Sequence, residues 1–269
     1  LDAVAHHYEL LGGRSPLNDL TFRQAARLEA ALGAAGPALP VHVGMRNWAP
    51  YLADALARMA AAGVRQAVGV ILSPHASEAS RERYTERVEA ARAALGAGAP
   101  AISYVPSWHL HPLFVTAVAD ATVEALVTLP EERRQAAALV FTAHSIPVAM
   151  AARGPYVAEV AASARAVATR LGRADWQIAY QSRSGNPRDP WLEPDVNDAL
   201  RALAAAGTRD AVVVPVGFVC DHVEVLYDLD VEARATAHGL GLGFVRASTV
   251  NDHPLFIRLL TQVVQDAAR

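Results

Sequence analysis

The sequence predicts an α/β protein built from two similar Rossmann-like halves. Short runs rich in β-branched residues alternate with alanine-rich segments of helical periodicity, and this alternation is typical of βαβ units with parallel sheets. The polar stretch 129–135 separates two comparable series. We therefore expect halves at 1–130 and 131–269, with a cleft between them at the carboxyl ends of strands.

The first half begins with helix-like sequence rather than with a strand. Its apolar runs PVHVGM, QAVGVIL and AISYV predict strands at 40–45, 66–72 and 101–105. Helical periodicity, with Gly33, Gly63 and Gly96 at helix ends, predicts helices at about 2–11, 19–34, 50–62, 77–95 and 113–128. Only three strands are evident in this half, so a leading strand and helix are expected to be missing from it.

The second half contains a fuller α/β series. Its apolar runs predict strands at 137–143, 177–182, 211–216 and 243–247. Amphipathic segments ending near Gly172, Gly207 and Gly239 predict helices at about 155–171, 195–206, 222–237 and 254–268.

Composition excludes several classes of function. The chain has 269 residues, 52% of them hydrophobic, and a formal net charge of −3, so no broad basic field favours nucleic acid. Cys220 is the single cysteine, which excludes an internal disulfide and a four-cysteine iron–sulfur cluster. No apolar stretch is long enough to span a membrane and no signal peptide is evident, so we expect a cytoplasmic protein.

A histidine and a carboxylate stand at two expected strand ends. His144 follows the strand at 137–143, and Glu224 follows the strand at 211–216. A neutral imidazole opposite a carboxylate suits both a borderline divalent metal and the removal of a proton. A histidine bonded to backbone explains His144 equally well, and a capping box with Asp221 as N-cap explains Glu224.

The helix after that strand carries an acidic ladder. Glu224, Asp228 and Glu232 recur every four residues, so a helix places them on one face, where like charges repel. A solvated face is the usual explanation of such a stripe, and a bound cation is the alternative.

The loop 181–195 is rich in glycine, proline and asparagine and carries Trp191. Its indole either closes a hydrophobic edge or stacks on a flat ligand. Arg46, Arg183 and Arg188 are candidates for acidic groups of such a ligand, against the simpler view of surface charges. His109 and His111 have the spacing of a metal pair but lack a third ligand.

These residues together resemble the ferrochelatase family, enzymes that insert ferrous iron into a porphyrin. The similarity runs nearly from end to end. It lies in YELLGGRSPL (8–17), VGMRNWAPYLADAL (43–56), FTAHSIP (141–147), YQSRSGNPRDPWLEPD (180–195) and PVGFVCDHVEVLYDLDVE (215–232). The alanine-rich chain with one cysteine and the variant SPHAS (73–77) is more similar to bacterial members acting on coproporphyrin III than to those acting on protoporphyrin IX.

The resemblance implies roles for individual residues. His144 is the expected active-site histidine and Glu224 its acidic partner, both also metal ligands, and Asp228 and Glu232 continue the acidic line. Tyr8, Ser15, Arg46, Trp191 and Phe218 match positions near the porphyrin. The implied fold has a parallel four-stranded sheet in each half, with the C-terminal helix returning to the first half.

The resemblance also implies cofactors and partners. Iron is a substrate that stays ferrous, so no cofactor is required, although a peripheral divalent cation is compatible with the ladder. Expected partners are porphyrin and Fe(II), with a peripheral membrane or another haem-pathway enzyme as further contacts, and the expected state is a monomer. The alternatives are a sirohydrochlorin-type cobalt or iron chelatase and a porphyrin- or haem-binding protein without catalysis.

Overall fold

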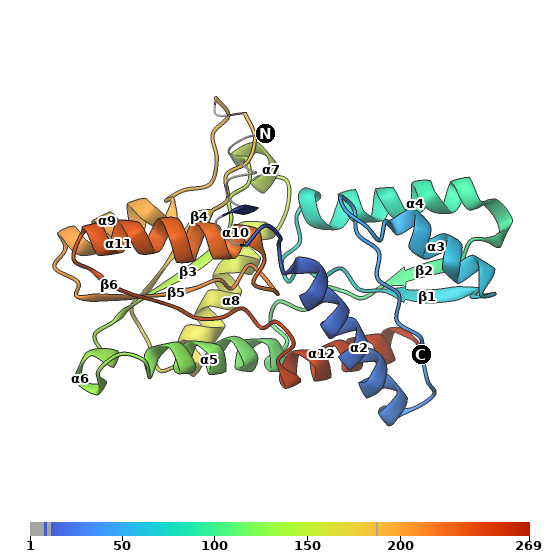
Figure 1. Ribbon diagram of the computed structural model, residues 1–269, viewed down its shortest axis with the longest axis horizontal. Helices are drawn as coiled ribbons and strands as arrows, with labels where there is room; N and C mark the ends of the chain where they lie inside the picture. Colours follow the sequence, from blue (N-terminus) through green and yellow to red (C-terminus); the bar gives the residue numbers. More distant parts are fainter. Residues whose placement is uncertain (1–7, 10–11, 187) are drawn as a thin grey trace.

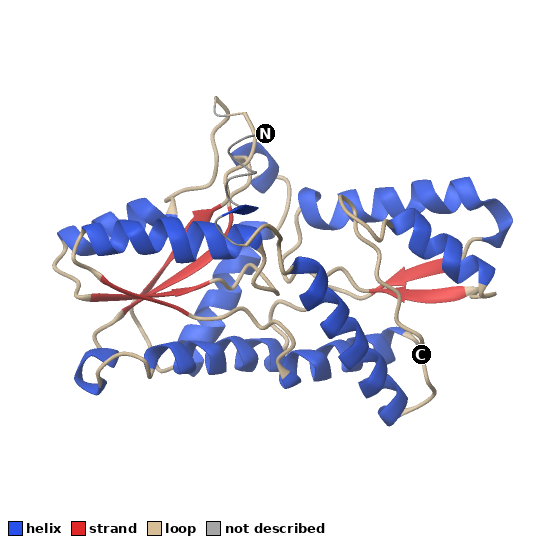
Figure 2. Cartoon of the chain, viewed as in Figure 1, coloured by secondary structure: helices blue, strands red, loops and turns tan. Residues whose placement is uncertain are grey.

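The computed structural model describes residues 8–9, 12–186 and 188–269. Most of the helix expected at 2–11, including His6 and His7, lies outside this range. Two separate parallel sheets are flanked by helices, as Figure 2 shows in red and blue. The predicted α/β class with parallel sheets is therefore confirmed.

The larger sheet belongs to the second part of the chain. Its strands follow the order β4-β3-β5-β6 and all pair in parallel. Every residue of β5 is buried, and only the ends of β3 are partly exposed, which is the pattern of strands covered on both faces. The strands are β3 (Ala138–His144), β4 (Trp176–Gln181), β5 (Asp210–Val214) and β6 (Gly243–Arg246).

Helices cover this sheet on two sides, with α9 and α11 above it and α5 below it in Figure 1. The helix α5 packs against β5, β6 and α8, although it precedes the boundary expected near residue 130. The helices of this part are α5 (Pro112–Leu126), α6 (Glu131–Arg134), α7 (Val148–Ala151), α8 (Tyr156–Arg170), α9 (Val196–Ala205), α10 (Val223–Val225), α11 (Arg234–Gly239) and α12 (Pro254–Ala267).

The first part is smaller than the sequence predicted. Within the described residues its sheet contains β1 (Gln66–Gly69) and β2 (Ala101–Tyr104), so the expectations of three strands from the sequence and of four from the resemblance are wrong here. Residues 40–45 form no strand, because their bonds go to a turn and a side chain: Met45 bridges Tyr51, and Glu29 accepts from the Val41 N–H. Its helices are α2 (Leu17–Ala35), α3 (Leu52–Ala61), the π-helix Glu78–Glu82, α4 (Arg83–Leu95) and the 3₁₀ turn Gly96–Gly98.

The C-terminal helix joins the two parts. Helix α12 packs against both α2 and α5, and Figure 1 shows it beside α2, below the gap between the two sheets. Its apolar face, which includes Phe256, Leu259 and Leu260, is buried in the main hydrophobic core. Among the described residues, no helix is both long and apolar enough to cross a bilayer.

Candidate active site

His144 ends β3 and meets Glu224 from α10. The His144 Nε2 atom lies 3.7 Å from the Glu224 Oε2 atom, and the side chains are 30% and 44% exposed. The other ring nitrogen, Nδ1, lies 2.6 Å from the Ser145 carbonyl oxygen. A carbonyl only accepts hydrogen bonds, so Nδ1 carries the proton of the neutral ring and Nε2 presents its lone pair to Glu224.

His222 approaches the same carboxylate oxygen. Its Nε2 atom lies 3.3 Å from Glu224 Oε2, and its Nδ1 atom lies 3.1 Å from the Cys220 carbonyl. Burial acts to raise the pKa of Glu224, but the hydrogen bond from His222 and the positive charge that His222 and His144 carry when protonated outweigh it and lower this pKa. Glu224 therefore stays ionised down to a lower pH than an ordinary glutamate does.

The capping-box explanation of Glu224 is wrong. The helix begins one residue later than expected, with His222 at the N-cap and no side-chain capping bond. Asp221 instead accepts hydrogen bonds from Arg246 at 2.8 Å and Asn251 at 2.8 Å, because a partly buried arginine competes for its carboxylate. The Glu224 side chain is thus free to face the two histidines.

The acidic ladder continues along a π-helix, Leu226–Ala233, rather than along the regular α-helix expected. Burial raises the pKa of Asp228 to about 6, and the charges of Glu224 and Glu232 add to the rise against hydrogen bonds from Ser182 and Gln181. The three carboxylates therefore still lie close enough to repel. Glu232, the last of them, is exposed.

Ser182 supports this arrangement from the end of β4. Its backbone has φ 60°, in the left-handed region, which a non-glycine residue keeps only when its surroundings hold it there. Its hydroxyl donates to Asp228. Neither Ser182 nor His222 was assigned a role from the sequence; the D-H-x-E spacing was the available signal for His222.

Two of the expected porphyrin positions lie at this site. The Phe218 ring centroid is 6.5 Å from that of His144 and 5.4 Å from that of His222. Ser15, from the first part of the chain, accepts a hydrogen bond from the Val223 N–H at 3.2 Å. The two parts of the chain thus meet where α10 begins.

The other three expected porphyrin positions make contacts with residues other than His144. Arg46 donates to the Ala79 carbonyl at 2.7 Å and stacks over Tyr84. Trp191 is buried against Gly185 and donates a hydrogen bond to the Asn186 carbonyl, so it stabilises the loop that carries it. Tyr8 is half-buried, and its carbonyl accepts from the Gly13 N–H.

Three remaining expectations have clear structural outcomes. His111 caps α5 and His109 bonds Ser107 at 2.8 Å, and the described residues contain no group of three side chains arranged to hold a metal ion. Arg183 pairs with Glu193. Burial raises the pKa of Cys220 to about 12, with Asp221 adding to the effect, so its thiol stays protonated.

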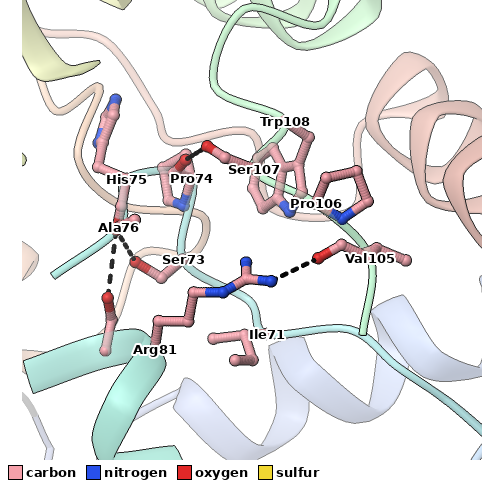
Figure 3. Close-up of a pocket in the computed structure, with 11 residues that line it drawn as sticks. Ile71, Ser73, Pro74, His75, Ala76, Arg81, Val105, Pro106, Ser107 and Trp108 are labelled. Atoms are coloured by element: carbon pink, nitrogen blue, oxygen red, sulfur yellow. Dashed lines mark hydrogen bonds between the residues drawn. The ribbon is translucent and has the colours of Figure 1, made fainter. Parts of the chain in front are cut away.

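Two cavities lie elsewhere in the structure. The one in Figure 3, behind the loops that follow β1 and β2, has a volume of about 10 Å³, room for one water molecule. There Arg81 reaches the Val105 carbonyl and Ser107 the Pro74 carbonyl, as dashed lines show. An open hollow of about 460 Å³ lies between α2 and the 41–50 segment. Neither contains His144 or Glu224.

Comparison with known proteins decides the family. The ferrochelatase family model matches residues 1–268. The chain belongs to the ferrochelatase family. It is therefore an enzyme of the class that inserts iron into a porphyrin.

Several named relatives share much of this sequence. The coproporphyrin III ferrochelatase of Mycolicibacterium smegmatis is 43% identical over 99% of this chain and 79% of its own length. Those of Nocardia farcinica and Frankia alni are each 45% identical over 99% of this chain, covering 78% and 71% of their own lengths.

Solved structures show the same fold at low identity. SirB from Bacillus subtilis, determined with Fe3+, superposes with a TM-score of 0.63 at 14% identity, over 91% of this chain and 88% of its own. DR2241 from Deinococcus radiodurans, described as structurally similar to chelatases, gives a TM-score of 0.53 at 18% identity, over 92% of this chain and 51% of its own. These likenesses concern the fold alone.

Proposed function

We propose that this ferrochelatase inserts Fe(II) into coproporphyrin III, with His144 and Glu224 handling the metal and the pyrrole protons. The names of the relatives support the substrate. The observation that carries the residue assignment is the pair of lone-pair-bearing atoms, His144 Nε2 and Glu224 Oε2, at 3.7 Å. Two such atoms face each other favourably only when a proton or a cation lies between them.

The separation of 3.7 Å is too long for a proton shared between the two atoms and fits a metal ion that both atoms bind. Two metal–ligand bonds of roughly 2.1 Å each, meeting at a tetrahedral or slightly wider angle, place their donor atoms about 3.4–3.7 Å apart. Fe(II) accepts both imidazole and carboxylate ligands. A pyrrole N–H, once the macrocycle is bound, offers a proton to the same His144 nitrogen.

The chemistry balances without a redox cofactor. Fe(II) replaces the two pyrrole hydrogens of the porphyrin, so each turnover releases two protons and iron stays ferrous. His144 accepts a proton at Nε2 as general base. Glu224, ionised because of its lowered pKa, attracts the cation. Asp228, with a pKa of about 6, is suited to pass a proton on toward the exposed Glu232.

The remaining site residues take supporting roles in this proposal. Phe218 packs against one face of the macrocycle beside His144, and Ser15 lies where the two parts meet. Arg46 and Tyr8 contact the periphery of the porphyrin, and Trp191 shapes the loop that borders it. A peripheral hydrated divalent ion would be held by Asp228 and Glu232, whose carboxylates suit such an ion.

Anaerobic metalation with Fe(II) tests this proposal. Purified protein is assayed with coproporphyrin III, protoporphyrin IX and sirohydrochlorin, and kcat/KM is compared. We expect the highest value for coproporphyrin III. A preference for sirohydrochlorin would favour the chelatase alternative, and tight binding of porphyrin without metalation would favour a binding protein.

A further inference from the structure

The peptide plane that joins His144 to Ser145 is held at both ends. Its carbonyl, on His144, accepts a hydrogen bond from the Tyr156 hydroxyl at 2.8 Å. Its N–H, on Ser145, donates to the Gln181 carbonyl at 2.7 Å. The plane lies where β3 leaves the sheet, at the position that presents the imidazole.

Tyr156 is itself firmly placed. It is the first residue of α8, is 6% exposed, and packs in a cluster with Ala143, Ile146, Val160 and Tyr180. The His75 ring meets its ring edge-on at 6.2 Å. Burial raises the pKa of Tyr156, so its hydroxyl remains a donor.

We propose that Tyr156 is a positioning residue for His144. This role rests on the proposed function of His144. It follows from the sequence of hydrogen bonds that runs from Tyr156 to the His144 ring. Tyr156 fixes the orientation of the His144–Ser145 plane, and Ser145 is fixed further by its hydroxyl, which donates to the Leu192 carbonyl at 3.0 Å. The next carbonyl, on Ser145, then receives the His144 Nδ1 proton, which leaves Nε2 directed at Glu224.

The variant Tyr156→Phe tests the proposal because it removes the hydroxyl and keeps the buried ring. We expect kcat for Fe(II) insertion to fall about ten- to hundredfold, the effect of a small displacement of a reacting group. Porphyrin affinity, measured by fluorescence quenching with metal-free coproporphyrin III, stays at the wild-type value. Tyr180→Phe is the matched control: it removes a hydroxyl from the same cluster without touching the His144 carbonyl, and we expect wild-type kcat.

A second readout does not depend on activity. In ¹⁵N-histidine NMR spectra at alkaline pH, we expect the wild-type His144 ring to carry its proton on Nδ1, and Tyr156→Phe to shift the ring toward a mixture of tautomers. His144→Gln assigns the signal. If the wild-type enzyme fails to metalate coproporphyrin III, the proposed function is wrong. The spectrum still tests whether Tyr156 sets the tautomer of the His144 ring.

Three outcomes would overturn the positioning role. The first is a wild-type His144 ring protonated on Nε2, which can be established even when Tyr156→Phe does not fold. The second is a folded Tyr156→Phe with wild-type kcat and an unchanged His144 signal. The third is an equal loss of kcat in Tyr156→Phe and Tyr180→Phe, which would indicate general disturbance of the cluster.

Discussion

At the scale of single residues, the site is built around one carboxylate oxygen. Glu224 Oε2 lies 3.7 Å from His144 Nε2 and 3.3 Å from His222 Nε2. His222 also faces the Cys220 carbonyl, so when protonated it donates from both nitrogens. His144 directs its Nδ1 proton at the Ser145 carbonyl, which leaves Nε2 for the substrate in the proposed function. The two imidazoles therefore have different tasks around the same acid.

Glu224→Gln tests the charge of this acid. The side chain is 44% exposed and makes no capping bond, so we expect a melting temperature close to that of wild type. Fe(II) insertion should fall by about a hundredfold or more, because the amide neither attracts the cation nor accepts a proton. Retention of over about a tenth of the wild-type kcat would contradict a charged role for Glu224.

Asp228 gives the fold a defined pH dependence. Its pKa is about 6 in the folded protein against an ordinary value of 3.8, so between these pH values the folded state binds a proton that the unfolded state does not. Stability from this residue is therefore greatest at low pH and is lost as pH rises through 6. The free energy of unfolding of Asp228→Asn, relative to that of wild type, should rise by on the order of 1–2 kcal/mol between pH 4.5 and pH 7.5.

Urea denaturation of both proteins at the two pH values measures this difference. The exposed Asp266, on α12, supplies the control Asp266→Asn, for which we expect no pH-dependent difference from wild type. If the gap between Asp228→Asn and wild type is the same at both pH values, Asp228 does not titrate as proposed.

At the scale of elements, the site depends on a close approach between a loop and a strand. A Cβ on Gly217 would lie 2.6 Å from both the Cα and Cβ atoms of Ala143. The Gly217 N–H donates to the Thr142 carbonyl at 3.0 Å. Phe218 and His222 follow on this loop, so its contact with β3 sets their distance from His144.

Gly217→Ala should push this loop away from β3. We expect a loss of about 1–3 kcal/mol of stability from overpacking, together with reduced metalation because Phe218 and His222 move. Gly33→Ala is the contrasting variant: nothing lies within 4 Å of the added carbon in α2, and a gain of about 0.5–1 kcal/mol is expected. Thermal unfolding measures the stability of both variants, and kcat measures their metalation activity. A Gly217→Ala protein as stable and active as wild type would refute the close contact.

The sequence predicted elements well where local pattern and packing agree. The strands that became β3 and β5 read as apolar runs because both of their faces are covered. Residues 40–45 have the same pattern but lack a paired neighbour, and strand pairing is not encoded within the run itself. The helix expected at 222–237 is interrupted by a π-helix, which an i, i+4 pattern does not distinguish from an α-helix.

The contact between His144 and Glu224 was also predictable from the sequence. His144 and Glu224 were identified because each follows a strand, and parallel strands end at one edge of a sheet. The role of Asp221 was not, because its partners Arg246 and Asn251 lie far along the chain. Tyr156 carried no local signal, since its proposed role depends on a hydrogen bond to a backbone carbonyl.

At the scale of the whole molecule, buried polar contacts tie the two parts together. Gln24 of α2, 2% exposed, donates to the carbonyls of Val219 and Asn251. On the other side, His75 Nε2 lies 2.9 Å from the Ser163 hydroxyl of α8, and Glu159 accepts from the Ala76 N–H at 2.7 Å. The loop before Glu224 and the helix that carries Tyr156 are therefore both braced from the first part of the chain.

His75 makes the contact between the two parts of the chain sensitive to acid. Burial, and secondarily the nearby His109, lower the pKa of His75 to about 3. Between that value and the ordinary 6.5 the unfolded chain binds a proton and the folded one does not, so stability falls as pH falls through this range. From pH 6.5 to 5 the loss is about 1.6 kcal/mol. This slope is opposite in sign to that of Asp228, so only variants separate the two.

His75→Gln places an amide near the Ser163 hydroxyl and cannot titrate. We expect it to lose less stability than wild type between pH 7 and pH 5 in urea denaturation, since contributions from all other groups are common to both proteins. His238→Gln, on the exposed face of α11, controls for the loss of a histidine and should follow the wild-type curve. Parallel curves for wild type and His75→Gln would mean that His75 can be protonated in the folded state, and that the contact between the two parts tolerates a charge.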